Sequence, residues 1–123
     1  MANSARYLLV IGEHDKGFGE PFAAVTVSGR RLRAITARLD VPVTFANMAT
    51  PERIVPTKQR IRSLQKQAQA AAAVVFLGRR VEQALRAHIP HGQYLPHPAA
   101  RRRVDTVALR EGLITLAQSA RNN

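Results

Sequence analysis

The feature that most constrains the fold of this chain is a series of short apolar runs separated by segments with helical periodicity. Two of the runs end directly before a glycine, as buried strands of a parallel sheet often do. Between the runs, apolar residues recur every three or four positions, which predicts amphipathic helices. The predicted strands are Tyr7–Ile11, Val41–Met48, Ala73–Leu77 and the shorter Gln93–Leu95. Strands that alternate with helices favour right-handed crossovers, so we expect an α/β fold: one three-layer α/β/α domain over residues 1–123 with a four-stranded parallel sheet.

The helical segments carry recognisable starts. Ser28 and Thr57 are plausible N-cap residues, because their hydroxyl oxygens can accept from the first free backbone N–H groups. A last helix is expected from about Asp105 to Ala120, where Gly112 weakens helix formation by about 1 kcal/mol relative to Ala. The helical positions expected to face the core are Leu32, Ile35, Leu39, Ile61, Leu64, Ala68, Ala71, Val81, Ala84, Leu85, Leu109, Leu113, Leu116 and Ala120.

The charge balance points to an anionic partner. The 123 residues include 19 Lys and Arg against 8 Asp and Glu, a net charge of +11. Such a surface attracts polyanions, most often nucleic acid, although an arginine-rich composition with a merely solvated surface would give the same balance.

The absence of Cys excludes disulfides, thiolate metal sites and iron–sulfur clusters. No run reaches the roughly 18 apolar residues of a membrane span, and the N-terminus lacks a signal-peptide pattern. We expect a cytoplasmic monomer, cellular or phage-encoded, that binds DNA and needs neither membrane nor cofactor.

Polar residues follow the predicted strands at the edge where parallel strands end, which is where open α/β sheets bind their ligands. Glu13 and Asp15 supply carboxylates that can activate a water or stabilise a developing cation, although a solvated turn would look the same. His97 lies between two prolines that fix its backbone, which suits a hydrogen-bond donor to a developing oxyanion. The residues expected to converge there are Gly12, Glu13, His14, Asp15, Asn47, Gly78, Arg79 and His97.

Three further features have both a functional and an ordinary reading. Phe22, in a loop punctuated by Gly and Pro, is either a core anchor or a flat face on which a base stacks. Asn47 suits the edge of a pyrimidine through its acceptor and donors, or it forms a turn. Arg101, Arg102 and Arg103 are either phosphate contacts or a solvated face. His88 and His91 have no carboxylate or Cys nearby that would complete a metal site, so no metal is expected.

In their order and spacing, several motifs resemble the uracil-DNA glycosylase superfamily, most closely its thermophile-type branch. The resemblance runs from about Tyr7 to Arg103. The motifs that carry it are Ile11-Gly12-Glu13, Glu20-Pro21-Phe22, Ser28-Gly29-Arg30-Arg31-Leu32, Phe45-Ala46-Asn47, Val74-Val75-Phe76-Leu77-Gly78-Arg79 and Leu95-Pro96-His97-Pro98-Ala99-Ala100. This resemblance implies hydrolysis of the N-glycosidic bond of uracil or a modified pyrimidine after the nucleotide is flipped out of the DNA.

The resemblance also implies a role for each matching residue. Glu13 would activate the water or stabilise the sugar cation, and His97 would donate to the base as the bond breaks. Phe22 would stack on the flipped base and Asn47 would read its edge. Gly12 and His14 would line the same pocket, while the arginines, Arg79 and Arg101 to Arg103, would grip phosphates.

The chain departs from the family pattern in three ways. His14-Asp15 stands where that branch has Pro-Gly, which leaves Asp15 as an alternative to Glu13. The four cluster cysteines are absent, and the chain is much shorter than most members. A binding module that keeps the fold without catalysis is therefore the second interpretation, and an enzyme acting on free nucleosides is a third.

Overall fold

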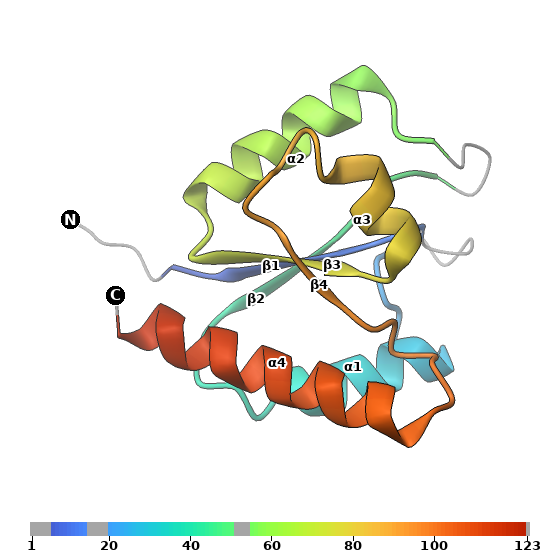
Figure 1. Cartoon of the computed structure of the whole chain (residues 1–123), viewed down its shortest axis with the longest axis vertical. Coiled ribbons are helices and arrows are strands. Elements are labelled where there is room, and N and C mark those ends of the chain that lie inside the picture. Colours follow the sequence, from blue (N-terminus) through green and yellow to red (C-terminus); the bar gives the residue numbers. More distant parts are fainter. Residues whose placement is uncertain (1–5, 15–19, 51–54, 123) are drawn as a thin grey trace.

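The computed structural model describes residues 6–14, 20–50 and 55–122 of the chain. Within these ranges, strands and helices alternate from β1 to α4 (Figure 1). In chain order the elements are β1 (Leu8–Gly12), α1 (Val27–Thr36), β2 (Val43–Asn47), α2 (Lys58–Ala70), β3 (Ala73–Leu77), α3 (Arg79–Leu85), β4 (Gln93–Leu95) and α4 (Arg103–Arg121). This alternation confirms the predicted α/β class.

The described strands form one four-stranded, all-parallel sheet in the order β2-β1-β3-β4. β1 is central, and its first residue, Leu8, is in register with Val43 on one side and Ala73 on the other. The residues from Leu8 to Ile11 have no exposed surface, because helices cover the sheet on both faces. The predicted parallel sheet is confirmed. Its inner strands β1 and β3 are buried, whereas its edge strands β2 and β4 are partly exposed.

The two faces of the sheet build two apolar cores. Leu9, Ile11 and Phe76 face the layer formed by α2 and α3, whereas Leu8, Val10 and Val75 face the layer formed by α1 and α4. Figure 1 shows the two helix layers on opposite sides of the sheet. This three-layer arrangement leaves the edge at which the strands end, called here the carboxyl edge, open for polar residues.

The element boundaries differ from the sequence-based expectation at several places. β3 and β4 have the predicted bounds, whereas β1 is shifted by one residue and β2 is shorter. Thr57 caps α2, with its hydroxyl accepting from the N–H of Arg60 at 3.1 Å. The prediction that Ser28 caps α1 is wrong: the cap is Thr26, whose hydroxyl accepts from the N–H of Gly29 at 2.9 Å.

Gly112 has a packing role that its helix propensity conceals. A Cβ atom at this position would lie 2.4 Å from Cδ2 of Leu95. The missing side chain therefore lets α4 approach β4 closely, and Leu95 packs into the core beneath α4.

Among the helices described here, none combines the length and apolar character needed to cross a membrane.

Candidate functional site

The Phe22 ring packs directly against the end of the central strand. A Cβ atom on Gly12, the last residue of β1, would lie 2.4 Å from Cζ of Phe22. Phe22 also contacts Phe45 of β2, with ring centroids 5.7 Å apart and ring planes at 60°. A side chain at position 12 would therefore require the Phe22 ring to move away from the end of β1.

Phe22 adopts a backbone conformation that a side chain rarely permits. Its φ of 51° makes it the one non-glycine residue with positive φ in the part of the chain that the structure describes. Such conformations cost of order 1–3 kcal/mol and persist only where neighbouring groups hold them. They occur preferentially at ligand-binding and active sites, which makes this loop a functional candidate.

Arg33 of α1 holds the Phe22 loop in place. Its Nε donates to the carbonyl oxygen of Phe22 at 2.7 Å, and its second terminal nitrogen donates to the carbonyl of Pro21 at 3.2 Å. The guanidinium also lies over the Phe45 ring, 4.9 Å from the centroid. One planar side chain thus binds two consecutive carbonyls and one aromatic face, which fixes where the Phe22 ring points.

The start of α1 is fitted closely beneath this loop. The hydroxyl of Thr26 donates to the carbonyl oxygen of Ala23 at 2.8 Å and also accepts from Gly29. A Cβ atom on Gly29 would lie 2.0 Å from the carbonyl oxygen of Ala23. These contacts couple the first turn of α1 to the segment that carries Phe22.

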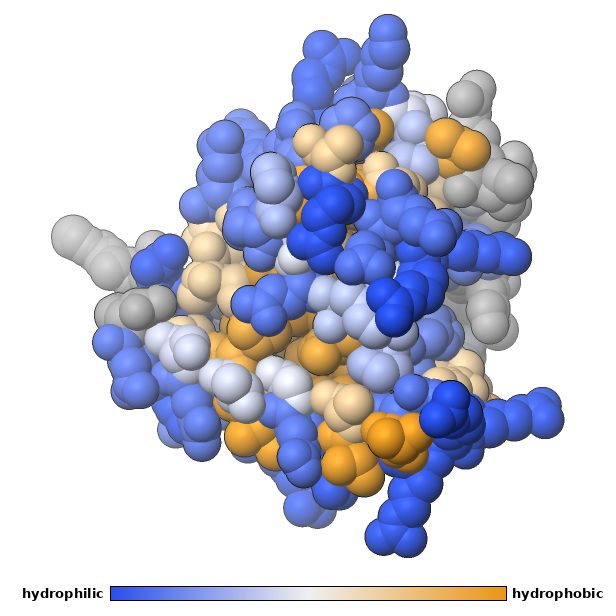
Figure 2. Space-filling model, in the orientation of Figure 1, coloured by the Kyte–Doolittle hydropathy of each residue, from blue (hydrophilic) through white to orange (hydrophobic). Residues whose placement is uncertain are grey.

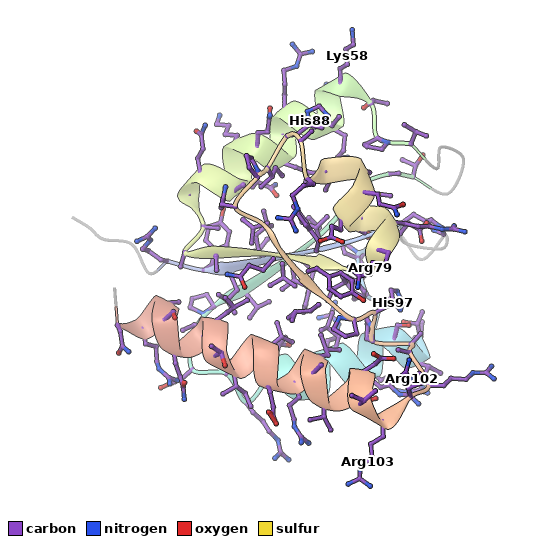
Figure 3. The ribbon with its side chains drawn as sticks, viewed as in Figure 1. Lys58, Arg79, His88, His97, Arg102 and Arg103 are labelled. Atoms are coloured by element: carbon purple, nitrogen blue, oxygen red, sulfur yellow. The ribbon has the colours of Figure 1, made fainter. Side chains whose placement is uncertain are left out.

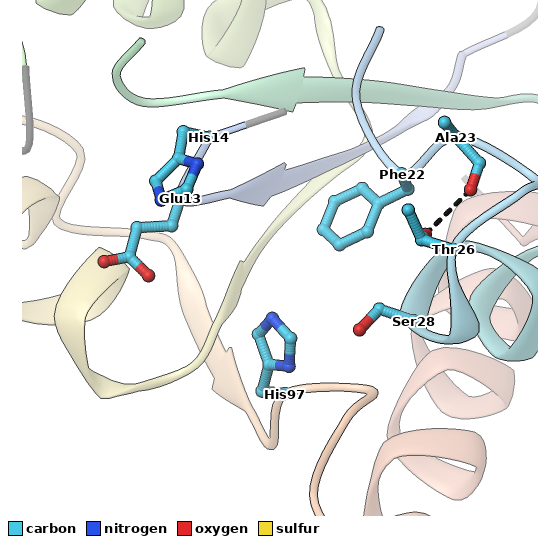
Figure 4. A pocket seen from close by; sticks show the side chains of 7 residues that line it. All are labelled: Glu13, His14, Phe22, Ala23, Thr26, Ser28 and His97. Carbon is cyan, nitrogen blue, oxygen red and sulfur yellow. Dashed lines mark hydrogen bonds between the residues drawn. The ribbon is translucent and has the colours of Figure 1, made fainter. Parts of the chain in front are cut away.

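A small cavity of about 50 Å³ opens at the carboxyl edge (Figure 4). Its volume suits a few water molecules. Figure 4 shows the Phe22 ring and the His97 imidazole on two sides of this space, with Ser28 at the start of α1 nearby. The residues that line this site cavity are Glu13, His14, Phe22, Ala23, Thr26, Ser28 and His97. The structure therefore brings together four of the residues that the sequence proposed as a site: Glu13, His14, Phe22 and His97.

His97 is held in one tautomer by its own loop. The backbone N–H of Ala99 donates to Nδ1 of His97 at 3.0 Å, so in the neutral ring the proton is on Nε2. The flanking residues Pro96 and Pro98 are both buried, which anchors this loop against the fold. Gly78 approaches from the β3–α3 turn with a φ of 95°, and a Cβ there would lie 3.7 Å from Cβ of His97. The geometry leaves His97 as a fixed N–H donor.

Glu13 lines the site cavity, but its carboxylate is directed elsewhere. Arg80 of α3 donates to Oε2 of Glu13 at 3.2 Å. In Figure 4 the carboxylate points toward α3, away from the space between Phe22 and His97. Glu13 also lines a second, wider cavity of about 440 Å³, together with Met48 and Val55. Glu13 thus lines both cavities, and its ion-pair partner Arg80 lines the wider one.

Other proposed site residues lie at the same edge without lining the site cavity. Asn47 ends β2 in register with Gly12, but it is not among the lining residues. Arg79 lies 3.9 Å from the centroid of the Tyr94 ring and pairs with Glu82 at 3.1 Å. Asp15 falls outside the described residues.

The arginines after the His97 loop are exposed. Arg101, Arg102 and Arg103 all lie on the surface where the chain enters α4. Figure 3 shows Arg102 close to His97 in projection, with Arg79 on the other side of His97, whereas Lys58 lies at the opposite margin of the view. Positive charge therefore borders the carboxyl edge near the site cavity.

Glu82 of α3, which does not line the site cavity, has a shifted pKa. Glu82 accepts from Arg86 at 2.8 Å and from Arg79 at 3.1 Å. The hydrogen bond from Arg86 lowers the pKa of Glu82, partial burial opposes this effect, and the contact with Arg79 adds to the lowering.

Within the described ranges, no group of three or more His, Asp or Glu side chains is arranged to hold a metal ion.

Sequence reasoning missed two residues that shape this site. In the sequence Arg33 is only one of several arginines on a helix, and nothing in its neighbourhood signals a bond to residues 21 and 22. Arg80 follows Arg79 directly, and no sequence pattern distinguishes the two, although Arg80 is the residue that pairs with Glu13. Both contacts join segments separated along the chain, so no local pattern reveals them.

The fold and the site define a three-layer α/β/α protein with a small cavity of mixed polar and apolar lining at the carboxyl edge of its sheet. Comparison with protein-family models finds no model that matches this chain, and comparison with curated proteins finds no match.

Proposed function

We propose that this protein is a DNA glycosylase that hydrolyses the N-glycosidic bond of uracil or a modified pyrimidine flipped out of DNA. The observation that carries the proposal is the pairing of the Phe22 ring with a fixed His97 donor across one cavity at the carboxyl edge. An aromatic face stacks on a base with about 1–3 kcal/mol, and a fixed N–H can stabilise the negative charge that the leaving base acquires.

In the proposed reaction, the bond between the sugar carbon and the base nitrogen breaks, and the base leaves as an anion. His97 Nε2–H donates to a carbonyl oxygen of that anion while Phe22 stacks on its ring. Water adds to the sugar carbon, and a carboxylate, Glu13 or Asp15, takes its proton. Because the cavity is much smaller than the roughly 300 Å³ at which typical ligand pockets begin, we expect base binding to widen it.

The test is incubation of the protein with single- and double-stranded oligonucleotides that contain uracil or hydroxymethyluracil, followed by alkali. We expect strand breakage at the modified base, and we expect His97→Ala to reduce the rate about a hundredfold or more. His88→Ala is a matched control, because His88 is exposed, follows the end of α3 and does not line the site cavity. No breakage in any substrate would contradict the proposal.

A second function, nucleic-acid binding without catalysis, is favoured by one specific observation. The Glu13 carboxylate is engaged by Arg80 and directed away from the cavity. On this alternative, wild type binds oligonucleotides in a salt-sensitive way but forms no product, and Glu13→Gln and His97→Ala leave affinity nearly unchanged. Fluorescence anisotropy with a labelled oligonucleotide, run beside the cleavage assay, separates the two functions. Activity on deoxyuridine but not on oligonucleotides would instead identify a nucleoside hydrolase.

A further inference from the structure

One wide cavity of the described surface has no part in the function proposed above. It is a groove of about 630 Å³ between α1 and α4, on the sheet face opposite α2 and α3. Figure 1 shows both helices on the same side of the sheet, and Figure 2 shows apolar side chains interrupting the hydrophilic surface over α4. The residues that line this α1–α4 groove are Ala34, Ile35, Arg38, Leu39, Arg110, Ile114, Ala117 and Arg121.

The groove lies away from the site cavity. Helices that follow parallel strands run back toward the edge where the strands begin. The lining residues come from the second half of α1, or just beyond it, and from the middle and end of α4. A partner bound there therefore leaves Phe22 and His97 accessible.

Its chemistry combines an apolar floor with positive ends. On α4, the lining residues Arg110, Ile114 and Arg121, with Ala117, follow helical spacing and form one stripe. Ile114 is 40% exposed, which is unusual for an isoleucine that serves only the core. At about 1.5 Å per residue the stripe is about 16 Å long, which matches roughly three turns of a helix laid beside it.

The three arginines of the groove carry uncompensated charge. Arg38, Arg110 and Arg121 are exposed, and none of them forms an ion pair with any residue that the structure describes. No acidic residue of the described ranges lines the groove; Asp40 and Glu111, although near in sequence, are not part of its wall. The groove therefore attracts negative charge at its rim and apolar side chains at its floor.

This combination selects among the kinds of partner. A second copy docked face to face would bring the same three arginines against each other, which like-charge repulsion opposes. Single-stranded nucleic acid would find phosphate contacts but no aromatic ring in the lining on which a base can stack. An amphipathic helix with apolar residues along one face and carboxylates near both ends satisfies floor and rim together.

We propose that the α1–α4 groove binds an acidic amphipathic helix of a partner protein. The apolar face of the partner covers Ile35, Leu39 and Ile114, and its carboxylates pair with the arginines at the rim. This inference does not depend on the glycosylase proposal, because the groove and the site cavity share no residue.

The test uses a fluorescein-labelled peptide of about 14 residues with Leu at i, i+3, i+4 and i+7 and Glu at both ends, titrated with the full chain. We expect saturable anisotropy that weakens as salt rises, at least tenfold weaker binding to the Arg110→Glu, Arg121→Glu variant, and a similar loss with Ile114→Glu. Both variants change exposed side chains, and circular dichroism checks that they remain folded. Arg62→Glu, an exposed change on α2, is the matched control and should leave binding unchanged.

Four outcomes of the peptide titrations would overturn the proposal. They are no saturable binding to wild type, equal binding by the groove variants, equal loss in Arg62→Glu, and equally tight binding of a peptide with Lys in place of Glu. Displacement of the peptide by a short oligonucleotide would assign the groove to nucleic acid instead. None of these results depends on glycosylase activity.

Discussion

Phe22 shows how one residue can be held in a conformation that it would not adopt alone. Its positive φ would relax in an isolated peptide, but Arg33 binds the carbonyls of Phe22 and Pro21 while Gly12 leaves room for the ring. The position of the aromatic face in the site cavity is therefore set by two residues, neither of which needs to touch a ligand.

We expect Arg33→Ala to lower the free energy of unfolding by about 1–3 kcal/mol, because two partly buried carbonyls lose a charged donor. Arg33→Lys should recover only part of this loss, since an ammonium cannot bind both carbonyls and lie flat over Phe45. Urea denaturation measures both. The control is Arg62→Ala, which is exposed and should change stability by less than about 0.5 kcal/mol.

We expect Gly12→Ala to destabilise the protein by about 1–3 kcal/mol, because its Cβ would overlap the Phe22 ring. A double-mutant cycle with Phe22→Ala checks the cause. If the ring is the obstacle, Gly12→Ala costs much less in the Phe22→Ala background. Equal costs in both backgrounds would show that the strand itself, not the ring, rejects the side chain.

At the level of the elements, α3 and the loop after it are organised around a single arginine. Arg86 donates to the carboxylate of Glu82 and to the carbonyl oxygens of Pro90 and Gly92. Its guanidinium also lies 5.2 Å from the centroid of the Phe76 ring. Arg86 thereby ties α3 to the segment that leads into β4, and so fixes the strand that ends before His97.

The Glu82 carboxylate should make this tie sensitive to acid. Its pKa is lowered in the folded protein, chiefly by the hydrogen bond from Arg86, so folding favours the ionised form. The stabilisation is complete above the ordinary glutamate pKa of about 4.3 and is lost as pH falls through the lowered value. We expect Glu82→Gln to reduce stability at pH 7, and the difference from wild type to be smaller near pH 3. Urea titrations at both pH values, with Glu111→Gln as an exposed control, measure this.

The bounds of the elements could be predicted where the sequence signal is local. β3 is an apolar run that ends directly before Gly78, and Thr57 is the one hydroxyl just before its helix, so the sequence predicts both correctly. At the start of α1 both Thr26 and Ser28 carry a hydroxyl that could cap the helix. Thr26 is the cap, and its hydroxyl also donates to the carbonyl oxygen of Ala23. That second bond depends on the path of the preceding loop, which no local pattern reveals.

The sequence predicts which residues gather at the candidate site, but it does not predict how their side chains are oriented there. Topology alone places Glu13 and His97 at the same edge of a parallel sheet. The direction of the Glu13 carboxylate depends on Arg80, which is far away in sequence, and the exclusion of Asn47 from the cavity lining depends on how the side chains pack. Such contacts follow from the folded structure, not from spacing.

For the whole molecule, two separate regions of positive charge have different expected partners. One is the loop of Arg101, Arg102 and Arg103 beside the site cavity, and the other is the rim of the α1–α4 groove. Because the net charge of +11 is shared between them and the remaining surface, total charge alone does not explain specificity. The regions can be tested against each other with equal changes of charge.

We expect three Arg→Glu changes at Arg101, Arg102 and Arg103 to weaken oligonucleotide binding. They should also reduce its log–log salt slope by roughly 0.9 for each phosphate that the variant no longer neutralises. The same three changes at Arg38, Arg110 and Arg121 alter net charge equally but should leave oligonucleotide binding much closer to wild type. Anisotropy titrations at several salt concentrations provide the measurement. Equal losses of affinity in both triple variants would mean that only total charge matters.

The central place of β1 has a consequence for how the protein is made. β1 precedes the other described strands, yet its two partners begin at Val43 and Ala73, and the helices that cover its two faces also follow it in the chain. During synthesis its apolar residues emerge long before any of these partners exist. Pairings between such distant segments form slowly, and until they form an unpaired apolar strand favours association between chains. Yield in a cell should therefore depend on how well Leu8 to Ile11 are shielded while the rest of the chain is still being added.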